Sequence, residues 1–459
     1  MVKARQKGER EMPLFGTSGI RGVVNKDLTL ELCREVAQAL GTALPPRARV
    51  CLATDTRVSR EALKESIFSG LLSCGIEVTD LGILPTPVLA LLTREWGFDS
   101  GIMVTASHNP PEFNGIKFFN QDSVGYSRAQ EQQIEELFSS KRFRTGTRGA
   151  LHRGRGMREG YLRFIQDRLP AKSFNSNLRI VVDPGNGAAS GFVSQLFAEI
   201  GLKVIPLNDT PDGLFPGRNP EPREDTLYNT VEFLREMKAD LAVCFDGDAD
   251  RVVFCDRQGF LGFNEPIAFI SRLAIEESGK RQVASTVETG GLLDLAVRDL
   301  GAEVVRGKVG DVNVAYLARE IDAALGVEQV GVYIIPKAGY YPDSILATLT
   351  LLSRIKEVAE IRDFFERMPK LFFEKRKVSC PNQLKETAMR KVAEKARLFG
   401  AKNLNMLDGL RLEFEDSWML VRASGTEPAI RVLAESTSLS KTQQLLDQGV
   451  QWIQPIVEG

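Results

Sequence analysis

The feature that most constrains the fold is an order of strand, helix, strand, helix and strand that recurs along the chain. The first occurrence has strand-like apolar runs and helical patterns in alternation, at 50–53, 59–74, 78–81, 87–96 and 101–104. Two further occurrences are bounded by strand-like runs at 178–182, 241–245, 282–287 and 324–327. This alternation is typical of α/β sheets, whose ligands bind beyond the carboxyl ends of the strands. We therefore predict three similar α/β domains whose strand ends can face one cleft.

The chain changes character after residue 370. A long helix and closely spaced strands are predicted there, at 385–398 and at 377–379, 410–414, 418–421 and 430–434. Such spacing favours a small α+β domain. A polar, Gly- and Arg-rich stretch at 141–156 marks the first boundary. We accordingly divide the chain into residues 1–150, 151–252, 253–370 and 371–459.

The composition argues against several function classes. The 59 Lys and Arg residues balance 60 Asp and Glu residues, so the broad basic field of a nucleic-acid-binding protein is missing. No apolar run approaches the ~20 residues that a membrane span needs. The charged start leads into no apolar segment, so we expect no secretory signal and a cytoplasmic location. The six cysteines form no CxxC pair and are predicted to be reduced core residues.

Ser107 lies in a loop that directly follows one of the apolar runs. The next residues, His108, Asn109 and Pro110, end regular structure and are expected to hold the serine in an exposed loop. A serine in such a loop can accept a phosphoryl group, and it can equally be an ordinary turn residue. A Ser-His-Asp hydrolase is disfavoured because no GxSxG motif surrounds Ser107.

Asp246, Asp248 and Asp250 occupy alternate positions in the loop after the run 241–245. Such a dense set of hard oxygen ligands suits Mg²⁺ or Mn²⁺, because the carboxylates would repel one another without a cation. An EF-hand is excluded, since Arg251 and Arg257 stand where that loop requires Gly and Glu. The alternative is a solvated acidic turn.

A third polar loop combines backbone amides freed by a glycine with hydroxyl and guanidinium groups. Its members are Arg422, Ser424, Gly425, Thr426 and, shortly after them, Arg431. These groups suit a phosphate dianion. A polar hairpin turn with two surface arginines would contain the same residues.

Taken in chain order, these loops resemble those of the α-D-phosphohexomutase family, which includes phosphoglucomutases, phosphomannomutases and phosphoglucosamine mutases. The resemblance spans nearly the whole chain and rests on the segment 15–22, Thr-Ala-Ser-His-Asn-Pro, Asp-Gly-Asp-Ala-Asp-Arg and Ser-Gly-Thr-Glu-Pro. It implies three similar mixed-sheet α/β domains and a C-terminal α+β cap, heart-shaped around a central cleft. It also implies a hexose or hexosamine phosphate as ligand and a monomer or homodimer.

The resemblance further implies roles for individual residues. Ser107 would be the phosphoserine, and its phosphate would share one Mg²⁺ with Asp246, Asp248 and Asp250. The residues expected to bind substrate are Arg251, Glu328, Arg422, Ser424, Gly425, Thr426 and Arg431. Those expected in catalysis besides Ser107 are His108 or Lys308 as acid/base, Arg21 and Lys117. A sugar 1,6-bisphosphate would be the intermediate and activator.

The expected sugar-binding loop departs from the family. The usual Gly-Glu-x-Ser-Gly, often followed by His, keeps Glu328 here but has Val330 and Val332 in place of the serine and the histidine. The segments 15–22 and 114–119 are most similar to phosphoglucosamine mutases and their archaeal-type relatives. Glucosamine phosphate is therefore the first expected substrate, followed by mannose and glucose phosphates as in a bifunctional phosphomannomutase/phosphoglucomutase.

Two other function classes stay open from the sequence. A metal-dependent sugar phosphatase would use the same acidic loop and release free phosphate. A sugar-phosphate sensor descended from a mutase would bind its ligand without turnover, a reading motivated by Val330 and Val332. The presence of the serine, the three aspartates and the cap loop favours the mutase.

Overall fold

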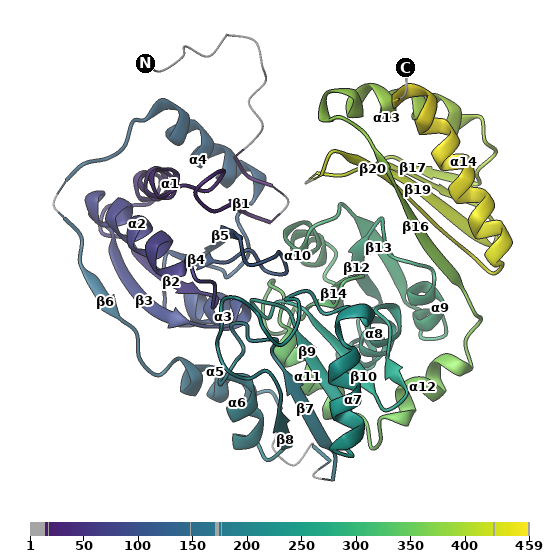
Figure 1. The fold of residues 1–459 in the computed structure, drawn as a ribbon, viewed down its shortest axis with the longest axis horizontal. Helices are drawn as coiled ribbons and strands as arrows, with labels where there is room; N and C mark the ends of the chain where they lie inside the picture. Colours follow the sequence, from purple (N-terminus) through teal and green to yellow (C-terminus); the bar gives the residue numbers. More distant parts are fainter. Residues whose placement is uncertain are drawn as a thin grey trace.

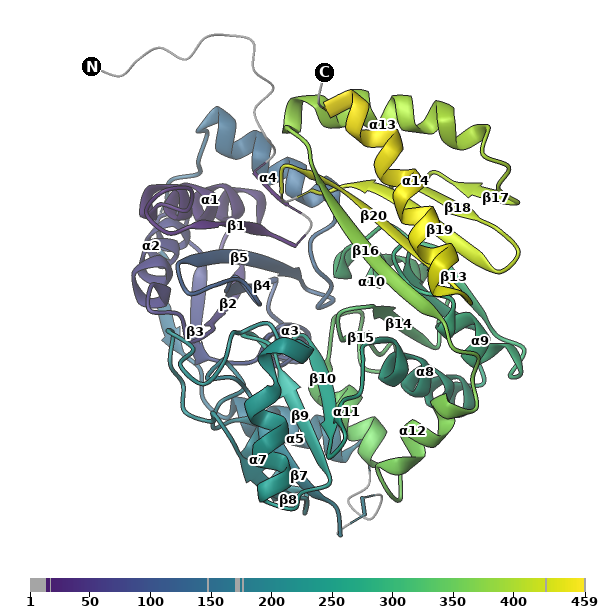
Figure 2. The same ribbon diagram turned by 45° about the vertical axis from the view of Figure 1, so that its right-hand side comes forward.

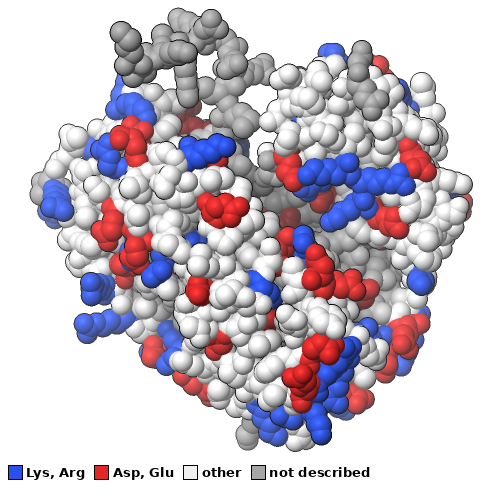
Figure 3. Space-filling model, in the orientation of Figure 1, with Lys and Arg blue, Asp and Glu red and all other residues white. Residues whose placement is uncertain are grey.

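A computed structural model describes residues 14–16, 18–146, 148–169, 174–175, 177–425 and 427–457. Within these residues the strands form four sheets, each with its own helices (Figure 1). The four lobes follow one another around the molecule in chain order (Figures 1 and 2). The surface is hollowed between the first lobe and the last (Figure 3). The fold class is therefore confirmed.

The first sheet carries the serine loop. Its strand order is β1-β5-β4-β2-β3-β6, and it is mixed because β1 and β5 run antiparallel to their neighbours. Its strands are β1 (Ile20–Val23), β2 (Arg49–Thr54), β3 (Glu77–Ile83), β4 (Ser100–Val104), β5 (Phe113–Asn120) and β6 (Leu151–Arg153). Its helices are α1 (Leu30–Ala43), α2 (Arg60–Ser73), α3 (Thr86–Glu95) and α4 (Arg128–Ser140). Residues 105–112, between β4 and β5, hold Ser107.

The second and third sheets have the orders β11-β10-β9-β7-β8 and β13-β12-β14-β15, with parallel centres and antiparallel hairpins at one side. The second lobe contains α5 (Met157–Gln166), β7 (Arg179–Asp183), α6 (Val193–Glu199), β8 (Lys203–Pro206), α7 (Tyr228–Glu236), β9 (Leu241–Phe245), β10 (Val252–Asp256) and β11 (Gly259–Phe260). The third contains α8 (Asn264–Ser278), β12 (Gln282–Thr286), α9 (Leu292–Arg298), β13 (Glu303–Gly307), α10 (Asp311–Glu320), β14 (Leu325–Glu328), β15 (Val332–Ile334), α11 (Ser344–Leu352) and α12 (Ala359–Glu366).

The last lobe is an antiparallel sheet in the order β16-β20-β19-β18-β17, with two long helices on it. Its elements are β16 (Phe372–Ser379), α13 (Asn382–Arg397), β17 (Asn403–Asn405), β18 (Leu410–Glu413), β19 (Ser417–Ala423), β20 (Ala429–Ser436) and α14 (Leu439–Val457). We call this lobe the cap. Its polar loop joins β19 to β20 and lies on the side of the hollow.

The sheets cross two of the expected domain boundaries. β6 pairs with β3 of the first sheet although it begins at residue 151, and β10 and β11 extend the second sheet past residue 252. The division of the chain by residue number stays a prediction. We propose that the first boundary follows β6, that the second follows β11, and that the third lies near residue 370.

One apolar cluster is shared by the first three lobes, which also contain further clusters of their own, and the core of the cap is separate. One buried cluster includes Leu89, Phe245 and Leu346, one from each of those lobes. The cap has its own cluster and meets the third lobe through a small group that includes Trp418 and Leu433. Because small, partly polar contacts between domains permit relative motion, the cap is the lobe expected to move.

Several local expectations can be compared with the structure. The six cysteines all lie in the described part of the chain, buried and unpaired, which agrees with the prediction. Ser59 begins the predicted helix 59–74 and was expected to cap it. It precedes α2 but makes no cap hydrogen bond, because its backbone is already helical, and its hydroxyl accepts from Asn114 Nδ2 at 2.9 Å. Among the described helices, none is long and apolar enough to cross a membrane.

A buried carboxyl between the second and third lobes opposes stability at neutral pH. Asp343 Oδ1 accepts hydrogen bonds from Tyr161 Oη (2.7 Å) and Leu346 N (2.9 Å), while Oδ2 has no hydrogen-bond partner among the described residues. Burial raises the pKa of Asp343 to about 6. The folded state therefore holds its proton more tightly than the unfolded state does. Stability falls as pH rises from about 4, the unfolded pKa, to about 6, and stays lower above that.

We expect Asp343→Asn to raise the free energy of unfolding by about 2 kcal/mol at about pH 8, because the amide keeps the Oδ1 contacts and removes the buried charge. Urea unfolding at about pH 4 and about pH 8 measures the difference. The gain should be much smaller at the lower pH, where the carboxyl is protonated in the folded state and about half protonated in the unfolded chain. An equal gain at both pH values would contradict this account.

Candidate active site

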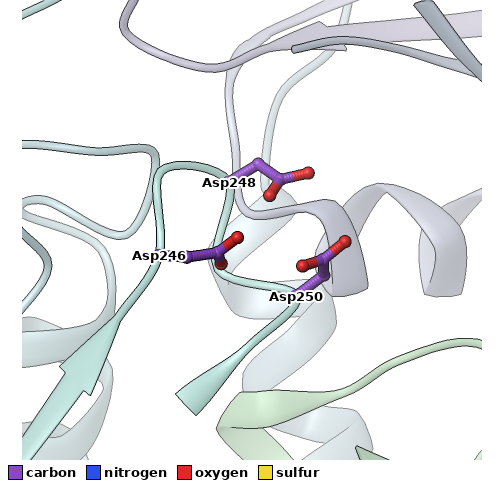
Figure 4. Close-up of side chains that lie close together, drawn as sticks. All are labelled: Asp246, Asp248 and Asp250. Atoms are coloured by element: carbon purple, nitrogen blue, oxygen red, sulfur yellow. The ribbon is translucent and has the colours of Figure 1, made fainter. Parts of the chain in front are cut away.

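Three aspartates converge in the loop between β9 and β10. Asp246, Asp248 and Asp250 are buried, and one oxygen of each lies within 4.8 Å of the others. Figure 4 shows their carboxylates turned toward a common space. The loop starts at the carboxyl end of β9, a fully buried strand, and Ala249 turns it with a φ of 57°. A short hairpin between two core strands thus brings three acids together.

The contacts of these carboxylates leave oxygens for a cation. Lys117 Nζ, from β5, donates to Asp248 Oδ2 (2.7 Å) and Asp250 Oδ2 (2.5 Å). Asp248 Oδ2 also accepts from Thr86 Oγ1 at 2.7 Å. Asp248 Oδ1 and Asp250 Oδ1 are buried and have no hydrogen-bond partner among the described residues. Unsatisfied carboxylate oxygens of this kind suit a hard cation such as Mg²⁺.

The charges of the acidic loop also favour a cation. Burial, followed by the charges of Asp250 and Asp248, raises the pKa of Asp246 well above its usual value. Burial acts on Asp248 as well, but the ammonium group of Lys117 brings the pKa of Asp248 below its usual value. Arg251, Arg21 and Lys117 offset part of the negative charge, yet the pKa of Asp246 stays raised. A divalent ion would relieve the remaining repulsion, so the residues fit the expected Mg²⁺.

Ser107 lies against the acidic loop from the first lobe. Its Oγ donates to Asp246 Oδ2 at 2.6 Å and lies 3.3 Å from His108 Nδ1. The expectation of an exposed serine needs correction, because Asp246 and Gly247 cover the residue and leave it buried. A Cβ atom at Gly247 would lie 2.4 Å from the Ser107 carbonyl oxygen, so this close approach requires glycine.

His108 and Arg21 flank Ser107. The positive charge of Arg251, followed by burial and the charge of Arg21, lowers the pKa of His108 and keeps the imidazole neutral. Arg21 Nη1, from β1, donates to Asn109 Oδ1 in the serine loop at 3.2 Å. Its Nε is buried without a hydrogen-bond partner among the described residues, so one guanidinium N–H is available to an anion.

The two arginines of the cap loop lie opposite each other. In the register of β19 and β20, Arg422 pairs with Arg431, so their side chains share one face of the sheet. The turn between them contains Ser424 and Gly425, and Ser424 Oγ accepts a hydrogen bond from Glu427 N at 3.2 Å. Lys and Arg side chains gather on the cap beside the hollow (Figure 3). Thr426 lies outside the described residues.

Carboxylates pair with both cap arginines. Arg422 pairs with Glu288 of the third lobe (3.1 Å) and with Asp408 (3.0 Å). Arg431 pairs with Glu427 at 3.2 Å. A dianion entering this loop would compete with these carboxylates for the same guanidinium groups.

Comparison with known proteins decides the family. Successive segments of the chain match phosphoglucomutase/phosphomannomutase alpha/beta/alpha domains I, II and III and its C-terminal domain, over residues 12–145, 159–259, 264–371 and 377–450. The chain belongs to the phosphoglucomutase/phosphomannomutase family. This phosphohexomutase is therefore an enzyme of the isomerase class.

Relatives of similar length support the assignment. A protein of Methanopyrus kandleri named as a probable phosphoglucosamine mutase is 38% identical over 97% of this chain and 98% of its own length. A phosphoglucomutase/phosphomannomutase of Thermococcus kodakarensis is 36% identical over 97% of this chain and 99% of its own. The crystal structure of a family protein from Burkholderia thailandensis superposes with a TM-score of 0.85 at 26% identity, covering 97% of this chain and 98% of that one.

In this phosphohexomutase the predicted sugar loop lies beside the acidic loop. Arg251 forms a β-bridge with Val332, and Val252 N donates to Gly331 O at 2.9 Å. Glu328, at the end of β14, accepts from Gly310 N at 2.8 Å, and burial together with the charge of Asp311 raises its pKa to about 7. The structure thus brings Arg251 and Glu328 to one side of the acidic loop.

The side chain of Val332 packs in the apolar core and is not exposed to a ligand. It is 2% exposed and belongs to the apolar cluster of the third lobe, which also contains Ala284 and Ile334. A valine there is explained by packing. Val330 is only partly buried beside that cluster, so it is the departure that bears on sugar contacts.

The contacts that join Ser107 and Lys117 to the acidic loop do not include Lys308. It is exposed in the loop between β13 and α10, and no hydrogen bond or ion pair joins it to another described residue. Its expected part in proton transfer stays a prediction.

Sequence reasoning missed several residues that support the site. Thr86 holds Asp248, Glu288 and Asp408 hold Arg422, and Lys385 Nζ donates to the carbonyl oxygens of Ser424 (2.6 Å) and Glu427 (2.5 Å). Glu288 comes two residues after the carboxyl end of β12, a position that could have signalled a binding role. Lys385 sits in an amphipathic helix among other lysines, where no local pattern singles it out.

Proposed function

We propose that this phosphohexomutase interconverts the 6- and 1-phosphates of a hexosamine, with glucosamine phosphate as the first choice and Ser107 as the carrier of the phosphoryl group. The observation that carries the proposal is the 2.6 Å hydrogen bond between Ser107 Oγ and Asp246, one of three converging carboxylates. The 38% identical relative of Methanopyrus kandleri supports the choice of glucosamine.

The proposed reaction moves a phosphoryl group between oxygens. A hydroxyl oxygen of the bound sugar monophosphate bonds to phosphorus as the bond between Ser107 Oγ and phosphorus breaks, which produces a sugar 1,6-bisphosphate. The bisphosphate turns over in the cleft, and its other phosphoryl group returns to Ser107. Held by Asp246, Asp248 and Asp250, Mg²⁺ would neutralise charge on the transferred group. Positioning by the protein supplies most of the remaining acceleration.

We assign the acid/base step at Ser107 Oγ to His108, which gives this oxygen a proton as the phosphoryl group leaves and takes one back when a phosphoryl group returns. The proton that the sugar hydroxyl loses passes to an oxygen of the transferred phosphoryl group. His108 Nδ1 lies 3.3 Å from Ser107 Oγ, and the imidazole is neutral and so able to accept. Phosphate groups in the site would offset the charge of Arg251 and raise the pKa of His108 toward the working range. Lys117 suits another role: although burial acts against it, the charges of Asp248 and Asp250 raise its pKa, so it remains an ammonium group. In that form it stabilises negative charge.

The cap loop is proposed to hold the distal phosphate in both orientations of the bisphosphate, and Arg422 is its central group. We expect Arg422→Ala to raise KM by about 10- to 100-fold with a smaller change in kcat, because a charge-assisted hydrogen bond to phosphate is worth about 1.5–3 kcal/mol. Steady-state kinetics measures both constants. Arg376→Ala is the control, since Arg376 lies in the same sheet but pairs with Asp447 on α14. A KM equal to that of the unmodified protein would remove Arg422 from the phosphate site.

A substrate panel tests the function. Purified protein with Mg²⁺ and a trace of sugar 1,6-bisphosphate is offered glucosamine, mannose and glucose 6-phosphates, and each 1-phosphate product is detected by a coupled assay. Free phosphate is followed in parallel. Release of phosphate at the rate of isomerisation would favour a phosphatase, and tight binding without any turnover would favour a sensor.

The second candidate is a bifunctional phosphomannomutase/phosphoglucomutase. The 36% identical relative of Thermococcus kodakarensis bears that pair of names, and Val330 removes a hydroxyl from the sugar loop. It predicts comparable kcat/KM for mannose and glucose phosphates and a lower value for glucosamine phosphate in the same panel.

A further inference from the structure

A buried arginine lies directly beneath the serine loop, outside every residue set considered so far. We propose that Arg57, together with Asp55 and Thr105, positions Ser107 for phosphoryl transfer. This inference rests on the proposed role of Ser107 as phosphoryl carrier. Arg57 and Asp55 follow the carboxyl end of β2, and Thr105 follows that of β4, the adjacent parallel strand.

Arg57 joins the two ends of the serine loop through its guanidinium group. The side chain is 0% exposed. Nη2 donates to the carbonyl oxygens of Ser107 (3.0 Å) and Asn109 (2.6 Å), and Nη1 donates to those of Pro110 (2.5 Å) and Phe113 (2.9 Å). One planar group therefore fixes the path of the backbone from the reactive serine to the start of β5.

The remaining nitrogen of Arg57 connects to the other side of Ser107. Nε donates to Asp55 Oδ2 at 3.0 Å, and the same oxygen accepts from Thr105 Oγ1 at 2.6 Å. Thr105 Oγ1 in turn accepts the hydrogen bond of Ser107 N at 2.8 Å. Both the N–H and the carbonyl of Ser107 are thus tied to one buried ion pair.

The serine needs such support because of its backbone conformation. Ser107 has a φ of 52°, in the left-handed region that residues with a side chain rarely adopt. A free loop would relax from this conformation and carry Oγ away from Asp246. A displacement of about 1 Å can cost about 100-fold in rate, so a fixed backbone at Ser107 should raise the rate of phosphoryl transfer.

Residues of the second lobe contact Arg57 and its neighbour Thr56. The ring of Phe215 lies 5.2 Å from the guanidinium carbon of Arg57, and Thr56 Oγ1 donates to Asn186 O at 2.9 Å. Gly213 packs against this backbone, since a Cβ there would lie 2.4 Å from Thr56 O. Arg57 therefore links the lobe that holds the serine to the lobe that holds the acidic loop.

Three variants test the inference. Arg57→Lys keeps a charge for Asp55 but cannot reach the loop carbonyls, and Thr105→Val removes the hydroxyl that Thr105→Ser retains. We expect Arg57→Lys and Thr105→Val to lower kcat by about 10- to 100-fold while KM changes by less than about twofold. The rate at which glucose 1,6-bisphosphate phosphorylates Ser107, followed by intact-protein mass, should fall in parallel. Thr105→Ser should restore both.

Arg144→Lys is the matched control for stability. Arg144 also donates to backbone carbonyls of the first lobe, those of Leu44 (2.8 Å), Gly41 (2.5 Å) and Cys74 (3.1 Å), but these lie where α1 and α2 end. That side of the sheet is opposite to the carboxyl ends of β2 and β4. The control should lower the melting temperature and leave kcat unchanged.

The outcomes separate this inference from the proposed function. Unmodified protein that neither turns over nor takes a phosphoryl group on Ser107 would refute the proposed function itself. A different result would overturn the positioning role alone. In that result the unmodified protein turns over and takes a phosphoryl group on Ser107, while the Arg57→Lys and Thr105→Val variants lose only melting temperature. If Arg57→Lys fails to fold, the positioning role is tested by comparing kcat and the rate of Ser107 phosphorylation between Thr105→Val and Thr105→Ser.

Discussion

Ser107→Ala is expected to lower kcat by about 10⁴-fold or more in the mutase assay. In the proposed reaction this hydroxyl forms and breaks the bond to phosphorus in both half-reactions, so no other group replaces it. The variant should also fail to gain the mass of a phosphoryl group when incubated with a sugar 1,6-bisphosphate. The two measurements together separate a lost nucleophile from a general loss of activity.

Ser123→Ala is the control for this variant. Ser123 is likewise buried in the first lobe and has a left-handed backbone, with a φ of 63° against 52° for Ser107. It lies beyond β5. In the part of the chain that the structure describes, its hydroxyl donates one hydrogen bond, to the neighbouring backbone oxygen Asp122 O. Its loss should change stability but not turnover. Undiminished turnover in Ser107→Ala would refute the assigned nucleophile.

Asp246→Asn is expected to change stability and activity in opposite directions. The substitution removes a buried charge that Asp250 and Asp248 repel, so the metal-free protein should become more stable. It also removes an anionic ligand, so Mg²⁺ affinity should fall and kcat should drop by about 10³-fold, equivalent to about 4 kcal/mol of transition-state stabilisation. Melting temperatures with a chelator and with Mg²⁺, calorimetric titration of Mg²⁺ and the mutase assay give the three quantities.

Asp240→Asn provides the comparison for that experiment. Asp240 precedes β9 at the end opposite to the acidic loop and pairs with Arg257 at 2.9 Å. It should bind Mg²⁺ as the unmodified protein does and remain active. An Asp246→Asn protein that gains as much melting temperature as the unmodified protein at the same Mg²⁺ concentration would show that the ion binds elsewhere.

The elements that the sequence predicted are those that carry a local signal. The run 241–245 coincides with β9, and the run 101–104 lies within β4, because core strands of α/β sheets are continuously apolar. β5 (Phe113–Asn120) was not predicted as a strand. It contains Asn114 and Gly115, which are poor strand formers, and a Cβ at Gly115 would lie 2.4 Å from Ile20 O of β1. Its strand character comes from pairing with β1 and β4 on both sides.

The sequence alone determined the family resemblance, the fold class and the identity of the three polar loops. Apolar periodicity and the chemistry of short loops are local properties, so they can be read without knowing which segments meet. Only the tertiary structure decided how the loops combine. The hydrogen bonds from Ser107 to Asp246, from Lys117 to Asp248 and from Thr86 to Asp248 join residues 139, 131 and 162 positions apart. Arg57 carries no motif, and its role follows from burial beneath a loop 50 residues away.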